Sequence, residues 1–144
     1  MSPLLFAGAY AGGIAGALLT LIAHVAPRFG VGNFIRDLDD PHLVGRRISH
    51  REAHFLGIFV HLCTSIASGI IFAYGVEQGW ISGFHILPMF GFATLMLLGS
   101  ALVLMPLEGH GFFGAKHDAW FVVDALLTNL FWGALHLLLI PLWA

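Results

Sequence analysis

Residues 53–76 read AHFLGIFVHLCTSIASGIIFAYGV, an apolar run that contains no Asp, Glu, Lys or Arg. A helix needs about 20 apolar residues to cross the hydrocarbon core of a bilayer. An open strand could not satisfy its backbone groups in lipid, so the run predicts a membrane-spanning helix. Three further runs of similar length predict three more spans, at about 4–25, 86–105 and 119–142.

The composition of the whole chain agrees with a membrane protein. Of its 144 residues, 58% are hydrophobic and only 10% are charged, whereas soluble domains contain about 25% charged residues. This excludes a soluble enzyme domain, and the length leaves room for about four spans and short connections. We therefore expect residues 1–144 to form a single all-α domain, a four-helix transmembrane bundle that lies in the lipid bilayer. The net charge of −2 and the lack of a basic run argue against a nucleic-acid partner.

The basic residues predict how the bundle is oriented. Five of the six lie between the first and second spans, and the sixth, Lys116, lies between the third and fourth. The connection between the second and third spans has none. By the positive-inside rule, the two basic connections are cytoplasmic and both the N and the C terminus lie on the outer side.

Local patterns predict where several helices begin and end. Ser49 followed by Glu52 is a capping-box pattern directly before the second apolar run. Gly79 is a good stop for that helix, and Pro106 is expected to end the third span. Met89 and Met96 lie seven residues apart on the third span, and we expect them to be core residues rather than copper ligands. The single cysteine, Cys63, cannot form an intrachain disulfide and is expected to be a small packing residue.

Glycines at intervals of four mark one face of the first span. Gly8, Gly12 and Gly16 form a repeated small-xxx-small motif, which lets two helix backbones approach closely in lipid. The partner helix is either another span of the same chain or a second copy, so a homo-oligomer is an open alternative.

The second span carries a polar stripe. At 100° per residue, its histidines and serines fall within a sector of roughly 60°, about 27 Å long; they are His50, His54, His61, Ser65 and Ser68. Such a face should point at protein, a cofactor or water rather than at acyl chains.

Several histidines and carboxylates gather at the cytoplasmic end and suggest a metal site. His50 and His54 have the i,i+4 spacing at which two imidazoles can ligate one ion. The candidate metal ligands are His50, His54, His61, His117 and Asp124. The alternative is that these side chains form hydrogen bonds to lipid headgroups, helix caps and loop carbonyls.

The histidines also permit a tetrapyrrole, because membrane cytochromes b hold haem between histidines on neighbouring helices. His85 and His136 are expected near the outer side, and His24, His54 and His61 nearer the inner side. We take His61, His136, His85 and His24 as candidate cofactor ligands, for haem or for another tetrapyrrole held by a single histidine. A third possibility is proton or metal movement along the stripe of the second span.

The order of motifs resembles that of a known group of proteins. A glycine-rich first span is followed by Asp40-Pro41, by the second-span sequence His61-Leu-Cys-Thr-Ser-Ile-Ala-Ser-Gly69, and by the turn Met105-Pro-Leu-Glu-Gly-His-Gly-Phe-Phe-Gly114. This order is similar to that of an uncharacterised family of small four-span prokaryotic integral membrane proteins. The resemblance implies a four-span fold and a prokaryotic inner (cytoplasmic) membrane, and it implies no activity.

The sequence thus favours a non-catalytic binding or accessory membrane protein, a subunit of a larger membrane assembly, whose histidine-bearing face holds a metal ion or a tetrapyrrole. Two alternatives remain open. One is a membrane metalloenzyme or haem b oxidoreductase with its site at the cytoplasmic side, and the other is a dimeric carrier of protons or metal ions.

Overall fold

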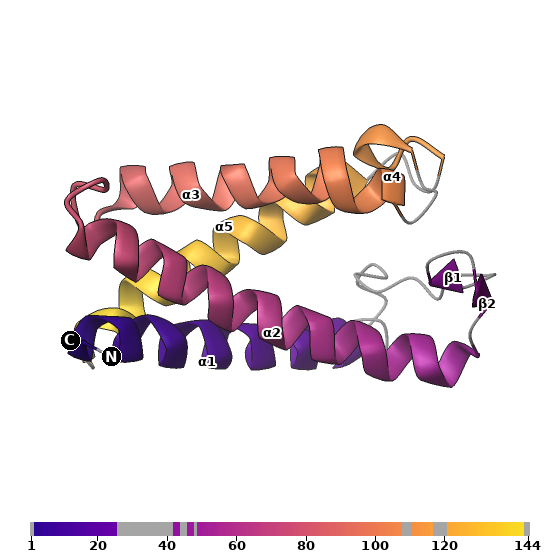
Figure 1. The fold of residues 1–144 in the computed structure, drawn as a ribbon, viewed down its shortest axis with the longest axis horizontal. Helices are drawn as coiled ribbons and strands as arrows, with labels where there is room; N and C mark the ends of the chain where they lie inside the picture. Colours follow the sequence, from indigo (N-terminus) through magenta and orange to yellow (C-terminus); the bar gives the residue numbers. More distant parts are fainter. Residues whose placement is uncertain are drawn as a thin grey trace.

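The structure, a computed structural model, describes residues 2–25, 42–43, 46–47, 49–107, 111–116 and 121–142. Its main helices are α1 (Pro3–Val25), α2 (His50–Glu77), α3 (Ile86–Gly99) and α5 (Phe121–Leu139). Figure 1 shows them running lengthwise, with both termini and the α2–α3 connection at one end, here called the terminal end. The strands β1 (His42–Leu43) and β2 (Arg46–Arg47) pair antiparallel at the opposite end, here called the hairpin end.

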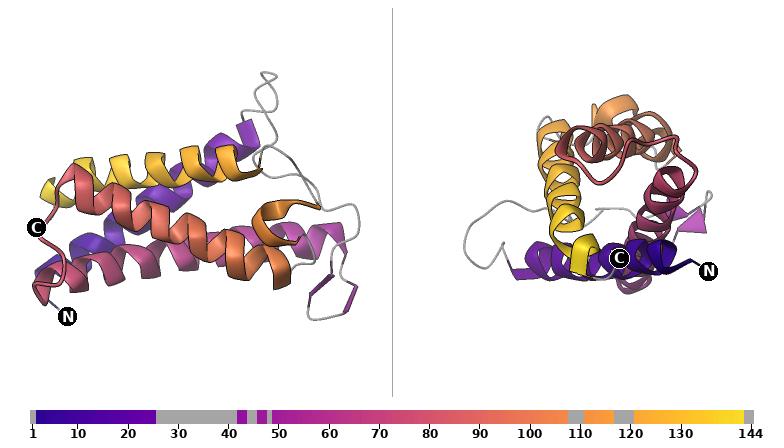
Figure 2. Two further views of the ribbon diagram at one scale, coloured as in Figure 1. Left: turned by 90° about the horizontal axis from the view of Figure 1, so that it is seen from above. Right: turned by 90° about the vertical axis from the view of Figure 1, so that its left-hand side faces the viewer.

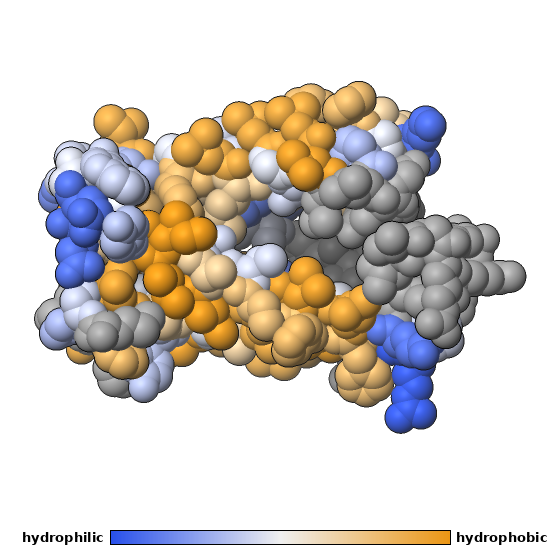
Figure 3. Space-filling model, viewed as in Figure 1, coloured by the Kyte–Doolittle hydropathy of each residue, from blue (hydrophilic) through white to orange (hydrophobic). Residues whose placement is uncertain are grey.

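Four helices in the described residues are long and apolar enough to cross a membrane, as predicted, which is compatible with a membrane protein. The apolar segments are Pro3–Val25, His54–Glu77, Ile86–Val103 and Val122–Leu142. Seen from the terminal end, the four helices surround a common axis (Figure 2). Hydrophobic residues cover the middle of the face shown in Figure 3, and hydrophilic ones gather at its two ends.

The glycine face of α1 packs against α2 of the same chain. A Cβ atom on Gly8 or Gly12 would collide with the backbone of Gly69 or Ser65, respectively. The two backbones therefore touch without side chains between them, as small-xxx-small motifs allow. Of the two expected partners of the glycine face, the structure shows the one inside the chain.

An aromatic core fills the terminal half of the bundle. Phe72, with no exposed surface, lies 5.6 Å from Phe84 and 5.2 Å from Phe92, measured between ring centroids. Phe92 in turn lies 6.1 Å from Trp132 of α5. Met89 is fully buried in this core. Met96 packs against it, so both methionines are core residues as predicted.

The predicted boundaries of α2 are confirmed. The Ser49 hydroxyl accepts a hydrogen bond from the Glu52 amide, and the Glu52 carboxylate accepts one from the Ser49 amide, which is a complete capping box. At the other end, Gly79 has a φ of +73°. The amides of Gly79 and Trp80 donate to the carbonyls of Val76 and Gly75. This is a Schellman motif, which ends a helix by satisfying its last carbonyls.

One boundary differs in detail and one local prediction is wrong. The third apolar span ends at Val103, within two residues of the prediction, but helical structure continues past Pro106 as the π-helical turn η2 (Ser100–Leu104) and the short α4 (Met105–Leu107). A π-turn shifts the hydrogen bonds from i−4 to i−5, so the missing amide of proline is accommodated within the helix. Cys63 is exposed rather than packed. It lies on the side of α2 away from the polar stripe, where a bilayer would contact it.

The remaining short elements complete the described chain. They are the 3-10 helices η3 (Phe112–Gly114) and η4 (Ile140–Leu142), of which η4 extends α5 at the terminal end. Ile140 in η4 is buried and belongs to the core.

Candidate functional site: a histidine-lined cavity and a histidine pair

The polar stripe of α2 faces α1 and α5. The Ser65 hydroxyl, in a side chain only 3% exposed, donates a hydrogen bond of 2.7 Å to the carbonyl of Gly12. The indole Nε1 of Trp132 in α5 donates a hydrogen bond of 2.7 Å to the same hydroxyl. Ser65 therefore joins three helices, and the prediction that this face points at protein is confirmed for the stripe from His54 to Ser65.

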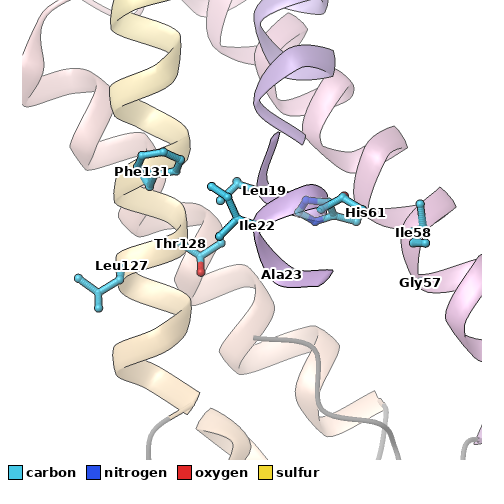
Figure 4. Close-up of a pocket in the computed structure, with 10 residues that line it drawn as sticks. Leu19, Ile22, Ala23, Gly57, Ile58, His61, Leu127, Thr128 and Phe131 are labelled. Atoms are coloured by element: carbon cyan, nitrogen blue, oxygen red, sulfur yellow. The ribbon is translucent and has the colours of Figure 1, made fainter. Parts of the chain in front are cut away.

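A cavity of about 580 Å³ lies between α1, α2 and α5, towards the hairpin end from Ser65. Its size is within the range of 300–1,000 Å³ that is typical of small-molecule sites. Its walls are mostly apolar and consist of Leu19, Thr20, Ile22, Ala23, Gly57, Ile58, His61, Leu127, Thr128 and Phe131. Figure 4 shows Thr128 and Phe131 on α5 on one side and His61 on α2 on the other, with Leu19 and Ile22 of α1 between them in this view.

His61 is the main polar group in this wall. Its Nε2 atom is buried and forms no hydrogen bond of standard geometry, although the backbone of Gly16 in α1 lies close enough to interact with the ring. The hydroxyl of Thr20 does not supply one, because it donates to the carbonyl of Gly16 at 2.8 Å. Buried polar atoms in folded proteins nearly always have a partner, so an imidazole nitrogen without a standard hydrogen bond beside a cavity suggests a group that is bound there.

A second pair of histidines lies at the hairpin end. The Nε2 atoms of His24 in α1 and His54 in α2 are 3.1 Å apart, and the two rings meet edge to face. The Nδ1 of His24 is 2.7 Å from the carbonyl of Thr20. Since a carbonyl can only accept, Nδ1 carries the proton and Nε2 of His24 presents its lone pair to His54.

His136 lies in the core instead. Its side chain has no exposed surface, and its ring stacks on Trp132 with the centroids 3.6 Å apart. Its Nδ1 donates to the carbonyl of Trp132 at 2.9 Å, while Nε2 has no partner and faces Gly69. A haem could reach Nε2 only if α2 and α5 moved apart.

Two other predicted ligands, His85 and Asp124, are not brought to these two places. His85 is exposed at the N-cap of α3 at the terminal end, and Asp124 is half-buried in the first turn of α5. His117 and the side chain of His50 lie outside the described residues. Among the residues that the structure describes, no group of three or more His, Cys, Asp or Glu side chains could hold a metal ion.

Sequence reasoning missed the partners of the stripe. It singled out Ser65 but not Trp132 or the carbonyl of Gly12, and it singled out His24 and His54 without pairing them. It also missed Thr20. Helical periodicity shows which residues share one face, but it does not show which other helix lies against that face.

No family model, no curated protein and no solved structure matches this chain.

Proposed function

We propose that this protein is a membrane-embedded binding protein that holds a tetrapyrrole in the cavity between α1, α2 and α5, with His61 as the single axial ligand. The observation that carries the proposal is the buried Nε2 of His61, which forms no hydrogen bond of standard geometry, in the wall of an apolar cavity of about 580 Å³. A neutral imidazole nitrogen is the usual proximal ligand of haem iron.

The walls suit a flat apolar macrocycle. Nine of the ten lining residues are aliphatic, aromatic, glycine or threonine, and Phe131 offers a ring for stacking across from His61. His61 lies seven residues, or about 10 Å, inside the span that begins at His54. At that depth the transfer of a hydrophobic cofactor from the lipid into the cavity changes its free energy little. The coordinate bond to His61 and the shape of the cavity would therefore determine which cofactor binds.

Two features favour this proposal over the alternatives. An oxidoreductase with a bis-histidine haem needs a second histidine at the cavity, and among the described lining residues His61 is the only one. A proton or metal carrier needs a continuous polar path along α2. Beyond His61 the polar path is interrupted, because the hydroxyl of Ser65 is already hydrogen-bonded to both Trp132 and the carbonyl of Gly12.

The proposed orientation in the membrane and the cellular location follow from the sequence predictions. In our proposal the hairpin end, which carries Arg46, Arg47 and Arg51, lies in the cytoplasm of a prokaryotic cell and both termini lie outside. The protein acts as an accessory subunit of a larger membrane assembly, delivering or storing the cofactor without catalysing a reaction of its own.

The proposal is tested by adding hemin to the detergent-purified protein and following the Soret band. We expect a shifted band that saturates at one hemin per chain. His61→Gly should lose it, and free imidazole should restore it by entering the vacated position. His85→Ala, at the opposite end of the bundle, is the matched control and should bind like the wild type.

Two results would overturn the proposal. One is a wild-type protein that leaves the hemin spectrum unchanged. The other is a His61→Gly variant that binds hemin with the wild-type spectrum and affinity, because the iron would then have another ligand.

A further inference from the structure

We propose a second, separate site at the hairpin end: a site for a divalent transition-metal ion, ligated by Nε2 of His24 and Nε2 of His54. The site bridges α1 and α2. It does not depend on the tetrapyrrole, and it was not foreseen as a pair from the sequence.

The distance between the two nitrogens fits a shared ion. Imidazole nitrogens bind Zn²⁺ at about 2.0–2.1 Å, so two of them 3.1 Å apart subtend an angle of about 100° at the metal. This value lies between the octahedral and the tetrahedral angle. Because the two nitrogens now point at each other, each ring would turn by roughly 40° for both lone pairs to meet an ion at this angle.

The hydrogen bond that His24 makes through its other ring nitrogen, Nδ1, is typical of a metal-ligating histidine. A ligating histidine usually donates its other ring N–H to a carbonyl or carboxylate, which fixes the ring and the tautomer. His24 does this through Nδ1 and the carbonyl of Thr20, at 2.7 Å. Its Nε2 is thus already a lone pair directed at His54.

His54 completes the site by exchanging one tautomer for the other. In the metal-free protein its Nε2–H donates to Nε2 of His24. When an ion binds, that proton leaves Nε2 and one is taken up at Nδ1 from water, so the ring stays neutral. The His54 side chain is exposed and begins its span, which gives water access both for this step and for the remaining coordination positions.

The position of the pair suggests what the metal would do. α1 and α2 are in backbone contact at Gly8 and Gly12, and nearer to the hairpin end the cavity is lined by both of these helices and by α5. An ion between His24 and His54 cross-links the two helices on the far side of the cavity. We therefore expect metal binding to raise the free energy of unfolding as well as to change the spectrum of the ion.

The experiment titrates metal-free protein with Co²⁺ and follows its visible absorption, with Zn²⁺ in competition. We expect one Co²⁺ per chain and a raised unfolding midpoint. His24→Ala and His54→Gln should each weaken binding by about tenfold or more, which corresponds to about 1.4 kcal/mol. His54→Gln can still donate a hydrogen bond to His24, so it separates loss of the metal ligand from loss of the contact.

The control variants are His85→Ala, an exposed histidine at the other end, and His61→Gly. Both should bind Co²⁺ like the wild type, so the hemin and metal experiments fail or succeed independently. The proposal is refuted if wild-type protein binds no Co²⁺, if His54→Gln binds it unchanged, or if His85→Ala weakens binding as much as His24→Ala does.

Discussion

Replacing Gly12 by Ala should destabilise the bundle, whereas the same change at the adjacent Gly13 should not. The two glycines are neighbours in α1 but face different surroundings. A Cβ atom on Gly12 would lie 2.9 Å from the Cα of Ile66 and 3.0 Å from the carbonyl carbon of Ser65. On Gly13 the nearest atom would be a side-chain carbon of Ile66 at 3.6 Å, an ordinary contact.

The magnitude follows from comparing the two variants. Alanine is favoured over glycine in a helix by about 0.8–1.0 kcal/mol, and this gain is the same at both positions. At Gly12 the new methyl meets backbone rather than a flexible side chain, so α1 and α2 must separate. Overpacking of this kind costs about 1–3 kcal/mol. The separation also stretches the hydrogen bond from Ser65, and such bonds contribute about 0.6 kcal/mol on average in membrane proteins.

We therefore expect the free energy of unfolding of Gly12→Ala to be lower than that of Gly13→Ala by about 1–3 kcal/mol, or roughly 5-fold to 150-fold in the unfolding equilibrium. The assay is reversible unfolding in mixed micelles with increasing dodecyl sulfate, followed by tryptophan fluorescence. Trp132 is a suitable reporter because it is 2% exposed and bonded to Ser65. Equal stabilities, or a more stable Gly12→Ala, would refute the backbone contact between α1 and α2.

Two further predictions concern other contacts. Trp132→Phe keeps an aromatic ring but removes the donor to Ser65. In a double-mutant cycle with Ser65→Ala we expect a coupling energy of about 0.6–1.7 kcal/mol. A coupling energy near zero would mean that this hydrogen bond contributes nothing to stability. Gly79→Ala should lower the free energy of unfolding by about 1–2 kcal/mol, because the residue has a φ of +73°. Gly91→Ala should not lower the free energy of unfolding, because Gly91 is helical and no atom lies within 4 Å of the new Cβ. Similar losses of stability in both variants would argue against the Schellman motif at Gly79.

Much of the fold could be predicted because it depends on local or one-dimensional properties. Hydrophobicity over bilayer-length windows located the four helices that are long and apolar enough to cross a membrane. The capping box at Ser49 and the stop at Gly79 involve neighbouring residues only. The π-turn that precedes Pro106 was not predicted, because nothing in a single sequence shows where such a turn forms.

The candidate site was harder to predict, because it depends on how separate helices lie against one another. Periodicity grouped His54, His61 and Ser65 on one face, and the structure agrees. The contact of His54 with His24 depends on the register that the α1 glycines impose on α2, which is a three-dimensional property. His136 was expected to be available to a cofactor, but Trp132, one turn earlier, covers its ring.

The unequal packing of the two halves has a consequence for dynamics. Backbone contact, the aromatic core and the bond between Trp132 and Ser65 all hold the terminal half, while the cavity interrupts the packing towards the hairpin end. Local opening takes the least free energy where buried contacts are fewest. Amide hydrogens of α1 and α5 beside the cavity should therefore exchange with deuterium sooner than those near Ala7 or Leu135.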